Sequence, residues 1–157
     1  MSIAISEIEL EGNAFEKNAV MLMPVSFKAE DNNKYSSTAI SFWKYAKNEL
    51  DLQLFSEPEV LVEQRSGEWF GPMILLSSAV VSGNSELISV FCGVVSNYLT
   101  DFFKGSSESP QIKLKVLYKE TKSTKTTEIS YEGDINGLDK LESSILEVVK
   151  RDKSWLT

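Results

Sequence analysis

The stretch "MILLSSAVVSGNSELISVFCGVVSNYLTDFFKG" (residues 73–105) is the most apolar part of the chain. Whether this stretch crosses a membrane or belongs to a globular core decides the fold class of the protein. A membrane span needs about 20 consecutive apolar residues. The stretch is long enough, but Glu86 divides it. After Glu86 large apolar side chains recur every three or four positions, which is typical of an amphipathic core helix. We therefore expect such a helix over residues 87–104, while a membrane-interacting segment over residues 73–103 stays as the alternative.

The ends of this helix are marked by small polar residues. The turn-like "SGNS" at residues 82–85 offers Asn84 or Ser85 as the N-cap, with Glu86 in the first turn, where the helix dipole favours an anion. The segment "GSSESP" at residues 105–110 is predicted to end the helix and to act as a linker.

The predicted elements before this stretch are two strands, a helix and a short third strand, at about residues 2–10, 19–27, 37–50 and 57–64. We expect an irregularity near Glu7 in the first strand, and an edge or bulge at Pro24, which has no amide proton to donate. Ser36 or Ser37 is the expected N-cap of the helix.

The segment "RSGEWFGP" at residues 65–72 is predicted to be a loop, because two glycines and a proline punctuate it. Within this loop Trp69 and Phe70 stand between glycines, and Trp155 stands in the C-terminal tail. Large aromatic side chains outside helices and strands either pack into the core from a loop or bind a protein partner. Both readings stay open, and Trp69, Phe70 and Trp155 are the predicted partner-binding residues.

The last third of the chain has the clearest pattern. "QIKLKVLYK" (residues 111–119) alternates apolar residues with mostly lysine, and "TTEISYEG" (residues 126–133) alternates in the same way with glutamate. This pattern predicts a β-hairpin that pairs lysines with glutamates. Asn136 and Asp139 then predict a capping-box-like start for a final helix.

Together these elements predict an α+β fold for residues 1–157, as a single compact domain with a flexible tail from about residue 152. Three helices are expected to cover a mixed or antiparallel sheet of about five strands.

Composition narrows the chemistry. The absence of histidine from the chain excludes Ser-His-Asp and Cys-His catalytic groups and His-ligated zinc. Neither a Walker loop nor a G-x-G-x-x-G motif is present, and Cys92 is predicted to be a buried apolar side chain. A net charge of −7 argues against nucleic-acid binding and against docking on anionic lipid. We infer no cofactor, metal or small-molecule substrate, and the single cysteine and the lack of a signal peptide predict a cytoplasmic protein.

Two rows of carboxylates keep an enzyme reading open. Glu7, Glu9 and Glu11 alternate along one predicted strand, and three more acidic residues cluster later, at Glu57, Glu59 and Glu63. Such rows can bind a hard cation or serve as a catalytic pair, although solvated faces of edge strands are the commoner use. The lysine row is also interpreted as a solvated strand face rather than a nucleic-acid site, and it comprises Lys113, Lys115, Lys119, Lys122 and Lys125.

From Phe42 onward, the layout "FWKYAKNELDLQ…GEWFGPMILLSSAVV…SNYLTDFFK…IKLKVLYKE…TTEISYEG" resembles the effector-associated constant component domains of prokaryotic conflict systems. "SNYLTDFF" is similar to the aromatic W-L-like motif that ends the apolar helix in that family. The N-terminal strands are extra, and the helix is less rich in alanine. The resemblance implies an accessory or adaptor module beside an antiviral effector, with no catalytic residues to transfer.

The leading expectation is therefore a non-enzymatic cytoplasmic adaptor that acts through a protein partner or through self-association. A membrane-acting effector that uses residues 73–103 and a carboxylate-based or metal-dependent enzyme are the alternatives.

Overall fold

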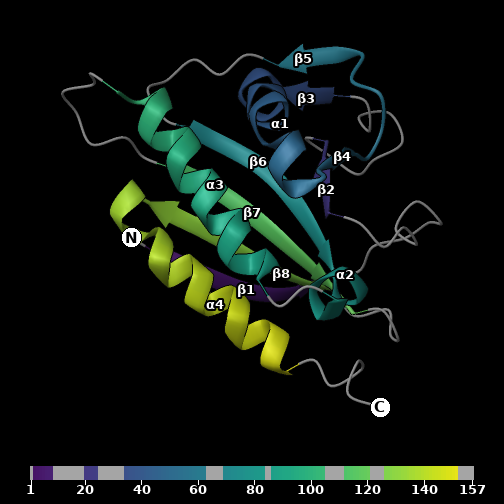
Figure 1. Ribbon diagram of the computed structural model, residues 1–157, viewed down its shortest axis with the longest axis vertical. Helices are drawn as coiled ribbons and strands as arrows, with labels where there is room; N and C mark the ends of the chain where they lie inside the picture. The colour runs from purple at the N-terminus through teal and green to yellow at the C-terminus, as the bar shows by residue number, and fades with distance from the viewer. Residues whose placement is uncertain are drawn as a thin grey trace.

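The computed structural model has two layers, a mixed six-stranded sheet and three long helices that cover one face of it (Figure 1). The structure describes residues 2–8, 20–24, 34–62, 69–83, 86–104, 112–120 and 126–151. The predicted α+β class is confirmed, with six strands in the main sheet rather than five. The elements are β1 (Ser2–Ile8), β2 (Val20–Met23), β3 (Lys34–Ser36), α1 (Ser37–Leu50), β4 (Gln53–Leu54), β5 (Val60–Val62), β6 (Trp69–Ser77), α2 (Ser78–Gly83), α3 (Leu87–Phe102), β7 (Ile112–Lys119), β8 (Thr126–Gly133), a 3₁₀ helix (Ile135–Gly137) and α4 (Leu138–Arg151).

The main sheet has the strand order β1-β8-β7-β6-β2-β4. Strands β1, β8 and β7 form an antiparallel group, β7 and β6 are parallel, β6 and β2 are antiparallel, and β2 and β4 are parallel. A separate pair, β3 and β5, runs parallel beside α1. The predicted hairpin is thus β7–β8, and the predicted N-terminal strand β1 lies at an edge.

Strand β6 lies inside the sheet, between β7 and β2, and the sequence did not predict it. Ile74 and Leu76 face the helices, whereas Leu75 faces the other side, and all three are fully buried. A strand that is apolar on both faces has no period-two pattern, so its sequence cannot be told from part of a buried helix.

The prediction of a loop at residues 65–72 is wrong for Trp69 and Phe70, whose backbone begins β6 and pairs with Ile112 and Lys113 of β7. The register then shifts by one residue before Met73. Such a bulge lets Gly71 and Pro72 sit within a strand, because the bulged position needs no ladder hydrogen bond from proline. The glycine–proline pair therefore marks a bulge and not the end of a loop.

The predicted helix α1 is confirmed with its bounds and its cap. The Ser36 side-chain oxygen accepts a hydrogen bond from the Ala39 amide at 3.0 Å, which satisfies one of the free amides of the first turn. Phe42 and Ala46 are fully buried on the face toward the sheet. Trp43 donates from its indole nitrogen to the Leu52 carbonyl at 2.9 Å, which ties the helix to the chain that follows it.

Three local predictions are corrected. Strand β1 pairs with β8 in unbroken register from Ser2 to Ile8, so there is no irregularity near Glu7. The N-cap position of α3 is occupied by Glu86 without a side-chain cap hydrogen bond, while Asn84 and Ser85 lie outside the described residues. A 3₁₀ helix that contains Asn136 leads into α4, in place of a capping box.

Tyr131 fixes the junction between β8 and the final helix. Its hydroxyl donates to the Asp134 carbonyl, and its ring is buried in the core. Burial, followed by the charges of Asp134 and Asp139, raises the pKa of this hydroxyl, so it stays a donor across the physiological range.

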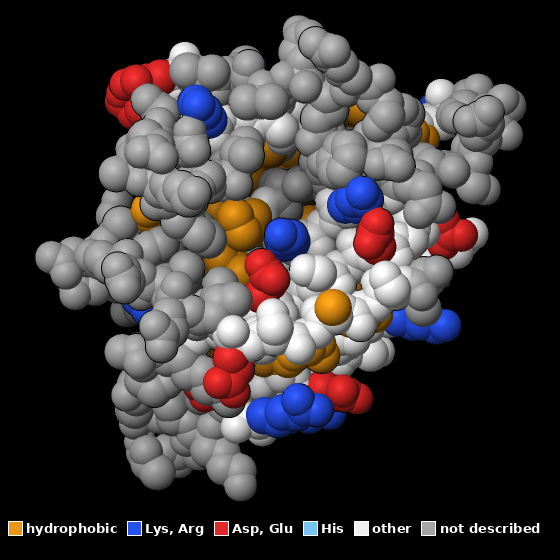
Figure 2. Space-filling view, turned by 180° about the vertical axis from the view of Figure 1, so that it is seen from behind, with side chains coloured by type: hydrophobic (Ala, Val, Ile, Leu, Met, Phe, Trp, Pro, Cys, Tyr) orange, Lys and Arg blue, Asp and Glu red, His pale blue; other side chains and the backbone are white. Residues whose placement is uncertain are grey.

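The face of the sheet away from the helices is partly apolar and partly charged. Met21, Met23, Leu75 and Leu117 form a small buried cluster there. Farther toward β1 the predicted lysine–glutamate pairing is confirmed, with Lys113 Nζ 3.5 Å from Glu132 Oε1 and Lys115 Nζ 3.9 Å from Glu128 Oε1. Figure 2 shows acidic and basic side chains side by side on this face, next to hydrophobic ones.

Two valines of α3 provide a matched test of this architecture. Val95 is 1% exposed and faces the sheet, whereas Val90 is 40% exposed. We expect Val95→Ala to lower the free energy of unfolding by about 2 kcal/mol, because it removes buried methyl groups and leaves a cavity. Val90→Ala should change it by less than about 0.5 kcal/mol. Urea denaturation measures both, and equal effects would contradict the orientation of α3.

Candidate interaction surface

Four aromatic side chains form a continuous row across α1 and α3, which we call the aromatic ladder: Tyr45, Tyr98, Phe102 and Phe103. The ring centroids of Tyr45 and Tyr98 are 5.4 Å apart, those of Tyr98 and Phe102 are 5.7 Å apart, and those of Phe102 and Phe103 are 4.8 Å apart. These separations lie in the range where aromatic pairs attract one another. The ladder is therefore one connected surface feature.

The helices position the ladder through Tyr98, which lies where α1 and α3 meet. Its ring meets the buried Phe42 edge-on at 5.3 Å, and its hydroxyl donates to Ser41 Oγ at 3.0 Å. Phe102 follows Tyr98 by one helical turn, so the two side chains share a face of α3. Tyr45 follows Phe42 by three residues on α1, at the border of its buried face.

Two members of the ladder are open to solvent, while Phe103 at its end is partly buried against the core. Tyr45 is 41% exposed and Phe102 is 47% exposed, while Tyr98 between them is only 6% exposed. A single exposed apolar residue needs no explanation, but adjoining exposed aromatic rings are typical of binding surfaces. Lys44, Asp101 and Lys104 are exposed beside them in the sequence. An aromatic centre with charged neighbours has the composition of a protein–protein interface.

The residues that the sequence predicts for partner binding are only partly placed. The backbone of Trp69 and Phe70 belongs to β6, but their side chains lie outside the described part of the structure, and so does Trp155. Their role stays a prediction. The ladder itself was missed, although "DFF" carried a signal: neighbouring residues on a helix point about 100° apart, so Phe102 and Phe103 cannot both face the sheet.

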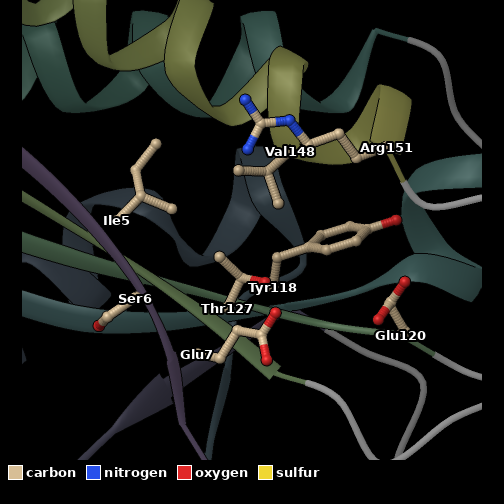
Figure 3. Close-up of a pocket in the computed structure, with 8 residues that line it drawn as sticks. All are labelled: Ile5, Ser6, Glu7, Tyr118, Glu120, Thr127, Val148 and Arg151. Atoms are coloured by element: carbon tan, nitrogen blue, oxygen red, sulfur yellow. The ribbon is translucent and has the colours of Figure 1, made fainter.

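A cavity of about 230 Å³ opens beneath α4, at the end of the sheet where β1 and β7 finish and β8 begins. Tyr118 and Thr127 line it from the sheet, and Val148 and Arg151 line it from α4 (Figure 3). Glu7 also faces this cavity, on the same side of β1 as Ile5, and it remains exposed as expected for an edge strand. The volume is smaller than the roughly 300–1,000 Å³ of typical ligand pockets.

The other predicted carboxylates do not gather into a described site. Glu57 and Glu59 are exposed in the irregular segment between β4 and β5. Glu9, Glu11 and Glu63 lie outside the described residues. Among the residues that are described, no group of three acidic or cysteine side chains is placed to hold a metal ion.

Cys92 lies on α3 and is 9% exposed. Burial, and then the negative charge of Glu142 on α4, raises the pKa of its thiol from 9.0 to about 12. The thiolate is the reactive form of cysteine, so a raised pKa suppresses nucleophilic chemistry at physiological pH. The environment of this residue is that of a packed side chain.

Within the described ranges, none of the helices combines the length and the apolar character that crossing a bilayer requires. Residues 73–102 divide among β6, α2 and α3, with residues 84–85 not described. No protein family, no curated protein and no solved structure matches the chain. The resemblance to effector-associated domains therefore stays a prediction.

We expect the thiol of Cys92 to react with Ellman's reagent at pH 8 about a thousandfold more slowly in the folded protein than in the unfolded chain. The raised pKa reduces the thiolate fraction about tenfold per pKa unit. Glu142→Gln should increase the rate, because it removes the second cause of the shift. The same protein in denaturant is the control, and rapid labelling of the folded protein would contradict the assignment.

Proposed function

We propose that this protein is a non-enzymatic adaptor that holds a partner protein on the aromatic ladder. The observation that carries the proposal is the contiguity of Tyr45, Tyr98 and Phe102, of which the outer two are 41% and 47% exposed. Aromatic residues at the centre of an interface supply much of its binding energy. Tyrosine and phenylalanine also lose little conformational entropy when they are buried.

The arrangement of the ladder fits an amphipathic helix as the bound element. The two exposed rings stand on different helices, and the lower Tyr98 lies between them, so a third helix can pack against both α1 and α3. Helix packing of this kind uses apolar side chains at spacings of three, four and seven residues. Since Lys44 and Lys104 accompany Asp101, we expect charges of both signs along the flanks of the partner helix.

The remaining chemistry of the described residues is consistent with an adaptor. Arg151 lines the same small cavity as Glu7 and Glu120, so both signs of charge are present there. On the open sheet face, Lys113 and Lys115 each lie within 4 Å of a glutamate. The resemblance seen in the sequence adds the proposal that the partner is an effector of a prokaryotic antiviral system and that both act in the cytoplasm.

A photo-crosslinking amino acid at position 102 tests the proposal directly. In the native cell the amino acid at position 102 should form a covalent adduct with one protein. The crosslinked segment of that protein should have the spacing of apolar residues that is typical of an amphipathic helix. The same amino acid at position 90 is the matched control, because Val90 is 40% exposed on the same helix but belongs to no aromatic contact.

With the crosslinked partner purified, Phe102→Ala should raise the Kd by about 30-fold, which corresponds to about 2 kcal/mol. Val90→Ala should leave the Kd within about twofold. Since Phe102 is 47% exposed, its truncation should lower the melting temperature by only a few degrees. Equal crosslinking from positions 102 and 90 would show that the ladder is not a specific binding site. Flotation of the protein with liposomes that is abolished by Phe102→Ala would show that the ladder binds a membrane surface. Either result would reject the adaptor function.

A further inference from the structure

The first strand of the chain forms one edge of the sheet in the part of the chain that the structure describes. Strand β1 has seven residues and pairs along its whole length with β8, and no other described strand lies beside it. Ser2, Ala4, Ser6 and Glu7 are exposed, and Ile5 is 42% exposed. On such an edge every second residue directs its amide and carbonyl away from the neighbouring strand, toward a side where no other described strand lies.

Proteins usually protect long edge strands, and the two edges of this sheet differ in that respect. Strand β4 at the opposite edge is only two residues long, so it offers little to pair with. Strand β1 contains no proline, no lysine and no bulge, and Glu7 near its end is its only charged residue. A long, regular and apolar edge of this kind is suited to strand addition.

The sequence of β1 matches a second copy of itself. "SIAIS", from Ser2 to Ser6, reads the same in both directions. In an antiparallel pair about a two-fold axis at Ala4, Ile3 of one copy lies opposite Ile5 of the other, and Ser2 lies opposite Ser6. Like residues therefore meet across the axis, and apolar β-branched pairs stabilise antiparallel neighbours.

Both isoleucines lie on the face of β1 that the helices cover. Ile3 packs against the main core, and Ile5 lines the cavity beneath Val148. Two new Ile3–Ile5 pairs would cover the partly exposed Ile5 in each copy. On the opposite face only small side chains meet, because Ser2, Ala4 and Ser6 point there, so a second strand can approach without a clash.

The charges of α4 add a second element of complementarity. Helix α4 runs in the same direction as β1, with Val148 and Arg151 at the level of Ile5 and Glu7 (Figures 1 and 3). Lys140 precedes Arg151 by eleven residues and lies on the same side of the helix. The distance between these two positions along the helix, about 16 Å, matches the distance from Glu7 back to Ser2 along β1. The two-fold axis would bring Glu7 of each copy toward the Lys140 end of the other.

We propose that two copies of this chain associate through antiparallel pairing of their β1 strands, centred on Ala4, so that the two sheets join into one. This inference goes beyond the adaptor function and does not depend on it, because the aromatic ladder lies on α1 and α3. The occupant of the β1 edge is a second copy and not a foreign peptide, since the match of the strand is to its own sequence.

Charge exchange at position 4 tests both the interface and its register. With purification tags at the C-terminus, the wild-type protein at tens of micromolar should sediment with twice the 17.6 kDa monomer mass. Ala4→Lys and Ala4→Glu should each raise the dimer Kd at least about tenfold, because position 4 meets itself and like charges repel. The two variants mixed in equal amounts should recover a dimer that contains one chain of each kind.

The control is Asn97→Lys, which adds the same charge on an exposed position of α3 and should leave the dimer intact. Ala4 is exposed beside a shallow cavity of about 200 Å³, so both long side chains have room in the monomer. As a second measurement, Ala4→Cys should form a disulfide-linked dimer under mild oxidation, because directly opposed Cα atoms lie about 4.5–5.5 Å apart.

A wild-type chain that stays monomeric would overturn the proposal. So would single variants that remain dimeric, or mixed variants that fail to pair. Tyr45→Ala with Phe102→Ala should leave the dimer unchanged, so failure of the adaptor function and failure of the dimer are read independently.

Discussion

The burial of β6 on both of its faces is the constraint on which the rest of this structure depends. Ile74 and Leu76 require a cover of helices on one side, and Leu75 requires a cover on the other. An apolar side chain contributes about 1.5–3 kcal/mol when it is fully removed from water, so neither face can be left open. Helices α1 and α3 supply the first cover, while Met21, Met23 and Leu117 pack on the second face.

That requirement weakens with distance from β6 along the sheet. At β7 and β8 the helix-facing side chains are apolar, whereas the other face carries the lysine–glutamate pairs and, at Leu117 of β7 alone, a buried apolar side chain of the second cluster. These exposed pairs contribute little to stability, roughly 0.2–1 kcal/mol each, but they help to fix which strands are neighbours. At β1 even the helix-facing side is incompletely covered, as the 42% exposure of Ile5 shows. The sheet thus changes from a buried centre to an edge strand whose described side chains are mostly exposed.

The sequence could predict the elements that have one apolar face and one polar face. The β7–β8 hairpin alternates cleanly, and α1 carries both its cap at Ser36 and a single apolar face. Strand β6 has no alternation of apolar and polar residues, and the bulge at Gly71 and Pro72 has the sequence of a loop. The sequence therefore predicted neither of them. The aromatic ladder could not be found by periodicity, because the contact between Tyr45 and Tyr98 exists only through the packing of α1 against α3. Surface sites that form between elements depend on tertiary structure. The symmetric sequence of β1, in contrast, can be interpreted as soon as the strand is known to lie at an edge of the sheet.

The two proposed surfaces also have a defined relation to each other. The ladder joins α1, which packs on β6 and β2, to α3, whereas β1 lies three strands from β6 at the far edge. With about 4.8 Å between neighbouring strands, the proposed dimer joined at β1 would separate its two β6 strands by about 34 Å. Its two ladders then face partners without competing for the same space. A partner that is itself oligomeric would meet both ladders at once, and the second contact would form at a high effective concentration. In the proposed dimer, self-association at the edge would therefore strengthen the proposed capture of a partner at the ladder without adding any contact to the ladder itself.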